Sequence, residues 1–243
     1  MKGIILAGGL GTRLHPLTRI TNKHLLPVYD KPMIFYSVEM LVKAGIEDIM
    51  IITGGTNSGD FLRLLGNGKH FGLKHIHYGY QEGEGGIADA LKICEDFVGK
   101  DKMVVVLGDN IIEKNIKATV KDFKAQKSGA KILLTKVDHP DQYGVAEVKG
   151  DKIIKIIEKP KKFISDLAVI GIYFYPNDVF SKIKTLKPSK RGELEITDVN
   201  NAYLKQGRLT YSVLDGWWLD AGESKDTLLD AGVFVKKHGA NHL

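Results

Sequence analysis

Short apolar runs alternate with longer segments that carry one apolar face in the first half of the chain. The runs predict strands at 3–7, 48–53 and 103–110. The longer segments predict helices at 31–45, 59–66 and 85–99. The third run contains three consecutive valines, which is typical of a strand buried on both faces. A chain that alternates strand and helix in this way predicts a parallel sheet covered by helices on both sides.

The helix predicted at 31–45 has residues that suit its two ends. Pro32 stands in its first turn, where an N–H group has no intrahelical partner, and Gly45 ends it. Its expected apolar face consists of Ile34, Val38, Leu41 and Val42. The helix predicted at 85–99 has a similar face, made of Ile87, Ala90, Leu91 and Cys94.

The second half of the chain is richer in strands. They are predicted at 130–137, 144–160, 167–176 and 209–215. A hairpin turn is expected at Gly150–Asp151, within the second of these segments. Helices are predicted at 176–186, 195–207 and 222–239. No repeat or low-complexity linker divides the chain, so we expect one domain over 1–243 with a mixed sheet.

Composition and charge narrow the class of partner. The 243 residues, 43% of them hydrophobic, suffice for one large α/β domain or two small ones. Lys and Arg number 35 against 29 Asp and Glu, a net charge of +6 that is spread along the chain. This excess either solvates the surface or attracts phosphorylated small molecules. No basic cluster is interleaved with aromatic residues, so nucleic acid is not an expected partner.

The only cysteine is Cys94, so no disulfide framework can form within the chain. We therefore expect a reducing, cytoplasmic compartment, and a buried core thiol at Cys94. The N-terminus lacks the pattern of a secretory signal peptide. No apolar stretch reaches membrane-spanning length, so no membrane partner is expected.

The first strand leads directly into GGLGTRL at residues 8–14. Gly9 and Gly11 match two positions of the dinucleotide fingerprint G-x-G-x-x-G, but the third position is Leu14. The P-loop pattern is absent. A third interpretation is a nest of backbone N–H groups that binds an anion, because glycine permits close approach and a positive φ.

Two cations stand close to this glycine loop in the sequence. Arg13 supplies a planar guanidinium that suits phosphate oxygens, and Lys23 follows soon afterwards. A tight turn beside a surface arginine is the alternative interpretation. The second cation favours a site that binds a polyphosphate.

Two carboxylates are candidates for chemistry. Asp109 follows a central apolar strand, at the end where open α/β sheets bind ligands, although Asp-Asn also favours a turn. Asp220, in WWLDAG, is by itself typical of a turn. Local sequence therefore leaves both residues open to a structural role.

Further stretches, taken in order, resemble the sugar-phosphate nucleotidylyltransferases, and among these most closely the thymidylyltransferases. The matching stretches are LAGGLGTRLHPLT, NKHLLPVYDKPM, LGDN, YGVAEV, EKP, GIYFYP, KPSKRGELEITDVNNAYL and WWLDAG. The resemblance implies a Rossmann-like three-layer α/β/α fold with a mixed, mostly parallel central sheet. It also implies a nucleotide-binding half over about 1–110 and a sugar-binding half over about 111–243.

The resemblance implies a reaction as well. A nucleotidyl group passes from dTTP to α-D-glucose 1-phosphate, and pyrophosphate leaves after in-line attack of the sugar phosphate on the α-phosphorus. Family members depend on Mg²⁺, form no covalent enzyme intermediate and assemble into homo-oligomers, so a dimer or tetramer is expected. Such a reaction requires positioning and charge neutralisation.

The roles of individual residues follow from the same resemblance. The expected catalytic residues are Arg13, Asp109 and Lys159, and the expected metal ligands are Asp109 and Asp220. Nucleotide-binding residues are expected at Leu6, Gly8, Gly9, Gly11, Thr12, Arg13, Lys23, Gln81, Gly86 and Asp109. Sugar-phosphate-binding residues are expected at Asn110, Gly144, Glu158, Lys159, Val169, Tyr173 and Arg191. Gln81 is the candidate for base recognition, because an amide offers both a donor and an acceptor.

The sequence departs from the family pattern in two places. The stretch QEGEGGIA has Glu84 where the family often has proline, which makes this loop less stiff and leaves UTP as an alternative to dTTP. The longer members carry a further C-terminal region that helps form a feedback site for the nucleotide-sugar product. We expect this chain to lack that site.

Three other functions compete with a thymidylyltransferase. The first is a uridylyltransferase or an enzyme of broad pyrimidine specificity. The second is a relative that binds without catalysis, which should have lost metal or phosphate residues that are all present here. The third is a nicotinamide-dependent oxidoreductase, which the missing third glycine argues against.

Overall fold

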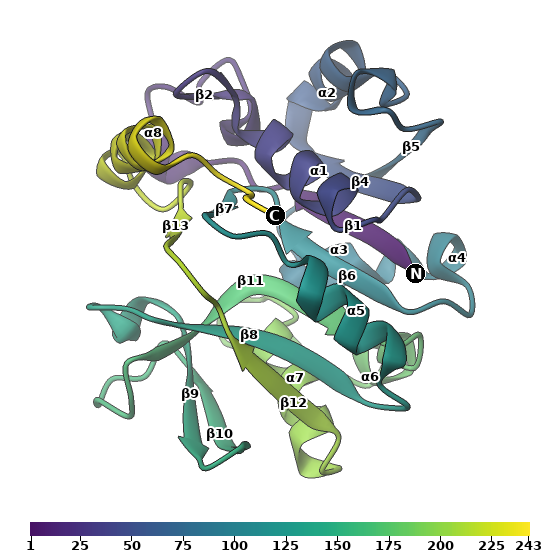
Figure 1. The fold of residues 1–243 in the computed structure, drawn as a ribbon, viewed down its shortest axis with the longest axis vertical. Coiled ribbons are helices and arrows are strands. Elements are labelled where there is room, and N and C mark those ends of the chain that lie inside the picture. Colours follow the sequence, from purple (N-terminus) through teal and green to yellow (C-terminus); the bar gives the residue numbers. More distant parts are fainter.

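A mixed nine-stranded sheet forms the centre of the protein in the computed structural model, which describes residues 1–243 (Figure 1). Its strands are β1 (Lys2–Ala7), β4 (Ile49–Gly54), β5 (Ile76–Gln81), β6 (Met103–Leu107), β8 (Ala130–Lys136), β9 (Gly144–Lys149), β10 (Lys152–Glu158), β11 (Leu167–Tyr175) and β12 (Leu209–Val213). Two strand pairs stand apart, β2 (Pro27–Val28) with β3 (Lys31–Pro32), and β7 (Asn110–Ile112) with β13 (Trp218–Asp220).

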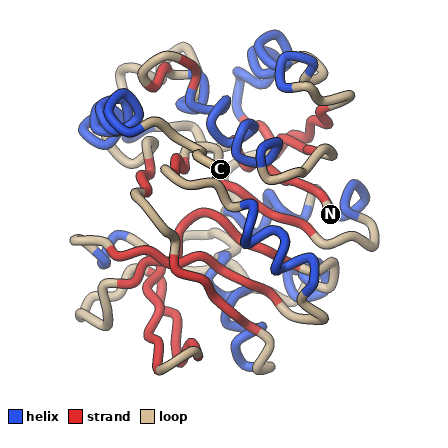
Figure 2. Tube along the Cα trace, viewed as in Figure 1, coloured by secondary structure: helices blue, strands red, loops and turns tan.

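The helices cover both faces of this sheet (Figure 2). They are α1 (Met33–Lys43), α2 (Ser58–Leu65), α3 (Ile87–Lys92), α4 (Glu95–Val98), α5 (Lys117–Ala125), α6 (Val179–Ile183), α7 (Ile196–Lys205) and α8 (Lys225–His238). Short 3₁₀ turns lie at Thr12–Leu14, Lys23–Leu25, Gly55–Asn57, Lys69–Phe71 and Pro140–Gln142.

The strand order joins a parallel half to a half with reversed strands. The main path is β10-β9-β11-β6-β1-β4-β5, and β8 pairs with both β11 and β12. The strands β6, β1, β4 and β5 are parallel, whereas β11 runs antiparallel to β6, β8 and β9. The predicted Rossmann-like α/β/α fold with a mixed central sheet is confirmed.

Alternation along β1 explains the three layers. Ile4 and Leu6 face one hydrophobic cluster with residues of α3, α6 and α7, whereas Ile5 and Ala7 face a second cluster with residues of α1, α2 and α5. Both sets of side chains are buried, because helices cover each face of the sheet. The apolar run at the start of the chain is therefore a central strand.

The C-terminal helix packs against the N-terminal half. Figure 1 shows α8, in yellow, beside β2 and β13 and away from β8 to β12 of the second half. A small cluster joins Ala231 and Val235 of this helix to Val28, Met33 and Tyr36. The chain just before α8 is thereby brought close to the glycine loop.

Three predicted elements are clearly shorter in the structure, and β5 and α5 were not predicted at all. The helix expected at 176–186 is reduced to α6. The helix expected at 85–99 is divided into α3 and α4, because the N–H groups of Ile93 and Cys94 bond to carbonyls three residues back and tighten the turn. The strand expected at 103–110 ends at Leu107. The Gly108 N–H still bonds to Leu6 O, and the chain then turns at Asp109 to form β7.

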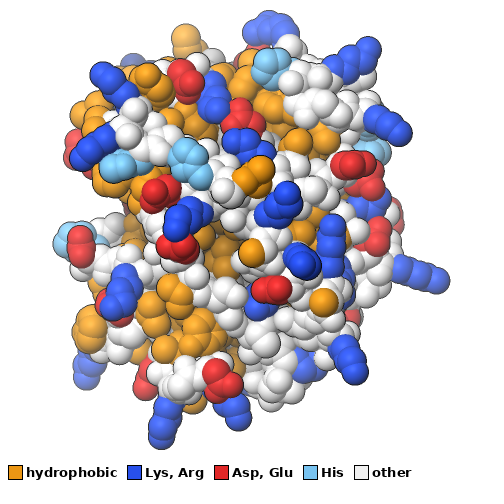
Figure 3. Space-filling view, in the orientation of Figure 1, with side chains coloured by type: hydrophobic (Ala, Val, Ile, Leu, Met, Phe, Trp, Pro, Cys, Tyr) orange, Lys and Arg blue, Asp and Glu red, His pale blue; other side chains and the backbone are white.

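Other local predictions are confirmed. The hairpin turn at Gly150–Asp151 joins β9 to β10, and Cys94 is completely buried. Lys and Arg side chains are scattered over the face drawn in Figure 3 and form no single basic patch there. None of the helices combines the length and the apolar character that crossing a membrane requires.

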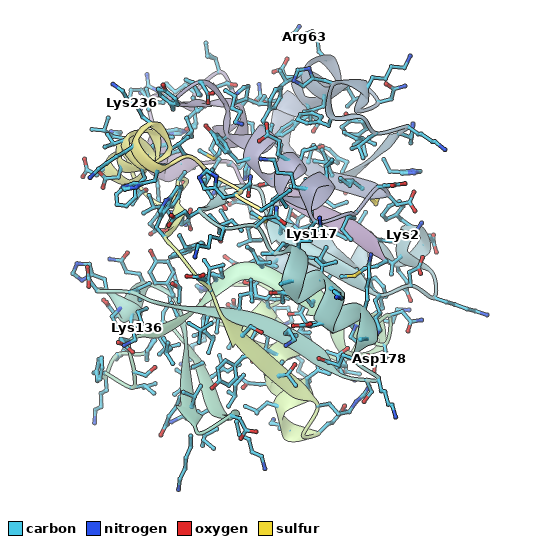
Figure 4. All side chains as sticks on the ribbon, viewed as in Figure 1. Lys2, Arg63, Lys117, Lys136, Asp178 and Lys236 are labelled. Atoms are coloured by element: carbon cyan, nitrogen blue, oxygen red, sulfur yellow. The ribbon has the colours of Figure 1, made fainter.

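A buried tyrosine links α7 to the residue just before α6, and its hydroxyl provides a test of the fold. Tyr203 is fully buried in α7 and donates a 2.5 Å hydrogen bond to Asp178, which is labelled in Figure 4. We expect Tyr203→Phe to lower the free energy of unfolding by about 1–2 kcal/mol, because the bond to a charged acceptor is lost. Urea denaturation measures the loss. Tyr29→Phe, at a residue that is 56% exposed, is the control, with an expected change below about 0.5 kcal/mol.

Candidate active site

A cavity of about 320 Å³ opens at the carboxyl ends of β1, β5 and β6. This is the edge where open α/β sheets bind ligands. Eight of the residues predicted to bind nucleotide line it, namely Leu6, Gly8, Gly9, Arg13, Lys23, Gln81, Gly86 and Asp109. We call it the nucleotide-side cavity, after the residues predicted to line it. The predicted residues Gly11 and Thr12 do not line it. Gly11 instead shapes the loop, with a φ of 66° and a carbonyl that accepts a bond from Thr18.

A second cavity, of about 250 Å³, lies between the two halves of the chain. All seven residues predicted to bind the sugar phosphate line it, namely Asn110, Gly144, Glu158, Lys159, Val169, Tyr173 and Arg191. The two cavities share five lining residues, which are Arg13, Ile87, Leu107, Glu193 and Asp220. We call this second one the sugar-side cavity, again after the residues predicted to line it. The two cavities therefore adjoin, with Arg13 and Asp220 at their common boundary.

A buried ion pair marks the inner wall of the nucleotide-side cavity. Asp109 is 5% exposed, and one of its oxygens lies 2.5 Å from the Lys23 ammonium. Burial alone would raise the pKa of Asp109, but the charge of Lys23 and the bond from Asn110 hold it well below its usual range. Burial alone would likewise lower the pKa of Lys23, and the Asp109 charge raises it instead. Each group keeps the other ionised.

Strand pairing brings the second carboxylate to the first. Asp220 ends β13 and lies opposite Asn110 of β7, and the Ala221 N–H donates to the Asp109 carbonyl. Burial, followed by the negative charge of Asp109, raises the pKa of Asp220 to about 7. Two carboxylates from distant parts of the chain thus compete for the neutralising charge of Lys23.

These carboxylates fit a hard divalent cation. The backbone passes close beside them, and only glycine fits there, since a Cβ on Gly222 would lie 2.6 Å from an Asp109 oxygen and 2.8 Å from the Lys23 nitrogen. Carboxylate oxygens are ligands that Mg²⁺ prefers, and the raised pKa of Asp220 reflects a negative charge that needs neutralising. Asp109 and Asp220 could hold such an ion together with phosphate oxygens.

The arginine of the glycine loop has a partner that the sequence analysis missed. Arg13 forms an ion pair with Glu223, which lies just after Asp220 in the chain and also lines the sugar-side cavity. Its side chain remains 56% exposed, so the guanidinium is accessible from solvent. A phosphate could take the place of the Glu223 carboxylate on the planar Arg13 guanidinium.

An acidic cluster surrounds the second arginine of the site. Arg191 lies 2.8 Å from Glu195, 3.7 Å from Glu193 and 3.9 Å from Glu158. Glu158 in turn accepts a 2.5 Å hydrogen bond from Thr197. This cluster offers both carboxylates for hydroxyl groups and a guanidinium for a phosphate.

Lys159 is held in an uncommon backbone conformation at the end of β10. Its φ is 42°, and its N–H donates to the Tyr143 carbonyl at 3.0 Å. Its side chain is exposed and forms no ion pair within the protein. A free ammonium beside the sugar-side cavity is available to a phosphate group.

Asn110 has a structural task in addition to its place in the sugar-side cavity. Its oxygen accepts bonds from the Gly171 N–H at 3.0 Å and from the Trp218 indole at 2.7 Å. Its amide nitrogen donates to Asp109 at 3.1 Å.

The sequence analysis did not predict Trp218, Thr197 or Glu223 as residues of the site. The first and last stand in WWLDAGE, where the neighbouring Asp220 was the only signal.

This fold and site define the class of protein. Residues 2–238 match the Nucleotidyl transferase family, and the chain belongs to that family. It is 47% identical over 240 residues to the glucose-1-phosphate thymidylyltransferase of Neisseria meningitidis serogroup A, covering 97% of this chain and 83% of that protein. It is 46% identical to the enzyme of the same name from Mycobacterium tuberculosis, covering 97% and 82%.

Solved structures agree with this assignment. A crystal structure described as a glucose-1-phosphate thymidylyltransferase from Bacillus anthracis, in complex with sucrose, superposes with a TM-score of 0.93. It is 55% identical, and the match covers 97% of this chain and 95% of that one. A UDP-glucose pyrophosphorylase complexed with UDP-glucose gives a TM-score of 0.83 at 26% identity, covering 97% and 98%.

The raised pKa of Asp220 predicts that the stability of the fold depends on pH. The pKa of Asp220 is raised to about 7, above its value of about 3.9 in an unfolded chain, so its protonated form stabilises the fold at low pH. That stability is fully present below about pH 3.9 and is lost as the pH rises from there through 7. We expect metal-free Asp220→Asn to melt above the parent protein at pH 8.5, by about 2–4 °C for each kcal/mol of relieved repulsion, and by a smaller margin at pH 5, where about a third of the effect has developed.

Thermal melts in buffers with a chelator measure this effect. Asp122→Asn, at an exposed position of α5, is the matched control and should leave the melting temperature unchanged at both pH values. An Asp220→Asn protein that melts below its parent at pH 8.5 would contradict the repulsion between Asp109 and Asp220.

Proposed function

We propose that this protein transfers a thymidylyl group from dTTP to α-D-glucose 1-phosphate, which gives dTDP-glucose and pyrophosphate. The observation that carries the proposal is the pair of adjoining cavities with Arg13 and Asp220 at their boundary. Family membership and the names of the relatives support the same reaction.

The nucleotide is assigned to the cavity at the carboxyl ends of β1, β5 and β6. Backbone N–H groups of the glycine loop, with Arg13 and Lys23, would bind the triphosphate. Gln81 would contact the base. Most lining residues of this cavity come from residues 1–110, which supports a nucleotide-binding half there and a sugar-binding half over 111–243.

The sugar phosphate is assigned to the other cavity. Glu158, oriented by Thr197, would accept bonds from sugar hydroxyls, while Arg191 and Lys159 would hold the phosphate. Gly144 leaves room there, because a Cβ on it would lie 3.2 Å from both Glu158 and Thr197. Val169 and Tyr173 would pack against the hexose ring.

In this arrangement an oxygen of the sugar phosphate attacks the α-phosphorus in line. A bond forms between that oxygen and phosphorus, the bond to the bridging oxygen of the β-phosphate breaks, and pyrophosphate leaves. Arg13 stands between the two substrates and would leave Glu223 to stabilise the charge that spreads over the α-phosphate oxygens. No group of the protein needs to form a covalent bond.

Asp109 and Asp220 would hold the Mg²⁺ ion of the family. When bound, that ion supplies positive charge that neutralises the triphosphate and the leaving pyrophosphate. Lys23 would then be released from Asp109 to contact a phosphate. Before substrate binds, Lys23 keeps the buried Asp109 ionised and ready for the metal.

We further propose a homo-oligomer, either a dimer or a tetramer, that works in the cytoplasm. The exposed apolar side chains of α8 support an assembly, since Leu229 and Val233 are 67% and 54% exposed. The buried, unpaired Cys94 is consistent with a reducing compartment.

The proposed substrate pair predicts a modest preference among pyrimidine nucleotides. Thymine differs from uracil by one methyl group, and its burial is worth about 0.8 kcal/mol, or about fourfold in rate. We therefore expect kcat/KM with dTTP to exceed that with UTP by roughly this factor. A pyrophosphate-release assay over five triphosphates and several sugar 1-phosphates measures it. Equal or higher efficiency with UTP would favour a uridylyltransferase instead.

The metal assignment predicts the effect of removing one carboxylate. We expect Asp109→Asn to lower kcat with dTTP and glucose 1-phosphate by about 100-fold or more, because the charge that holds Mg²⁺ is lost. Circular dichroism should show an intact fold, and Asp122→Asn should keep the parent activity. An Asp109→Asn enzyme with near-normal turnover would exclude Asp109 as a metal ligand.

A further inference from the structure

The amide of Gln81 is held in one orientation by two acceptors. Gln81 ends β5 and is only 7% exposed, and its nitrogen donates to the Gly86 carbonyl at 3.1 Å and to an Asp89 carboxylate oxygen at 3.0 Å. A carbonyl and a carboxylate can accept hydrogen bonds but cannot donate them. Both hydrogens of the amide nitrogen are therefore committed to the protein.

The amide oxygen of Gln81 has no donor from the protein. It borders the nucleotide-side cavity next to the glycine loop, where a Cβ built on Gly8 would lie 3.0 Å from it. A flip of the amide would place this oxygen against two acceptors and leave the nitrogen without them. The pocket therefore presents a hydrogen-bond acceptor, not a donor, at this position.

Asp89 supplies the orienting contact from the first turn of α3. The loop before the helix fits closely over this carboxylate, since a Cβ on Gly85 would lie 2.4 Å from the oxygen that binds Gln81. An acidic residue in a first helical turn can also act simply on the helix dipole. Here its oxygen points at a buried amide in the pocket wall, which gives it a second, specific partner.

We propose that Asp89 is a positioning residue that sets base selectivity by fixing the amide of Gln81. The acceptor so presented selects a base whose ring nitrogen carries a hydrogen, as N3 does in thymine and uracil. It disfavours cytosine, whose N3 is itself an acceptor. The inference rests on the proposed function, because it assumes that the base lies against Gln81.

The comparison of UTP with CTP tests this directly, since the two differ in the hydrogen-bonding pattern of the base edge. In Asp89→Asn the new amide can donate to the Gln81 oxygen, so that only the Gly86 carbonyl still opposes an orientation with the Gln81 nitrogen toward the pocket. We expect the ratio of kcat/KM for UTP to that for CTP to fall by about tenfold or more. A merely structural role would lower both efficiencies together and leave the ratio unchanged, which would overturn the proposal.

Two further variants make the outcome unambiguous. Asp96→Asn, at an exposed position in the next helix, should keep the parent ratio. Asp89→Ala removes one acceptor without adding a donor, and its ratio should fall by a smaller factor. If Asp89→Asn does not fold, Asp89→Ala decides, and an unchanged ratio in that protein overturns the proposal.

Calorimetric binding of UTP and CTP without sugar phosphate separates this proposal from the proposed function. A parent protein that prefers UTP in binding, with the preference reduced in Asp89→Asn, supports the role of Asp89 even if no nucleotide-sugar forms. A parent that makes dTDP-glucose while Asp89→Asn retains full discrimination contradicts the role of Asp89 and leaves the proposed function intact.

Discussion

Two carboxylates and one ammonium that meet in the wall of one cavity organise the whole site. Asp109 and Asp220 come from opposite halves of the chain, and their repulsion is tolerated because Lys23 stands against Asp109. The arrangement requires β7 to leave the main sheet and pair with β13. It also requires α8 to return to the N-terminal half, which brings the segment that carries Asp220 with it.

The charged groups around this site are balanced by partners of the protein itself. Arg13 pairs with Glu223, and Arg191 with Glu195, so the cations that could bind phosphate are held in place beforehand. A polyanionic ligand can replace these carboxylates at little cost, because it offers the same planar or forked acceptors. The two arginines are therefore arranged for anions without being left unpaired, whereas the negative charge of Asp220 is left for a cation to neutralise.

The local sequence predicted an element well where a single signal, such as a glycine-rich turn or the spacing of apolar residues, dominated. The glycine loop follows a central strand as expected, and the predicted apolar faces of α1 and α3 are buried except for the partly exposed Val42 and Ile87. The break between α3 and α4 was missed, because the helical spacing of apolar residues continues through Ile93 and Cys94. Only their backbone hydrogen bonds, which reach three residues back instead of four, mark the break. The end of β6 was missed because Gly108 and Asp109 follow an unbroken apolar run, and only pairing with β13 turns the chain there.

The sequence by itself determined most of the strands and helices, though not β5, α5 or the short strands β2, β3 and β13, and it determined the chemical types at the site. Periodicity and glycine placement encode backbone geometry within a few residues, and the ordered motifs indicated the family. Only the tertiary structure decided which groups meet. The partnership of Arg13 with Glu223 and the orientation of Gln81 by Asp89 depend on how separate elements pack. Contacts between elements leave no periodic trace in the chain, so the direction in which an amide points is fixed only once the elements have packed.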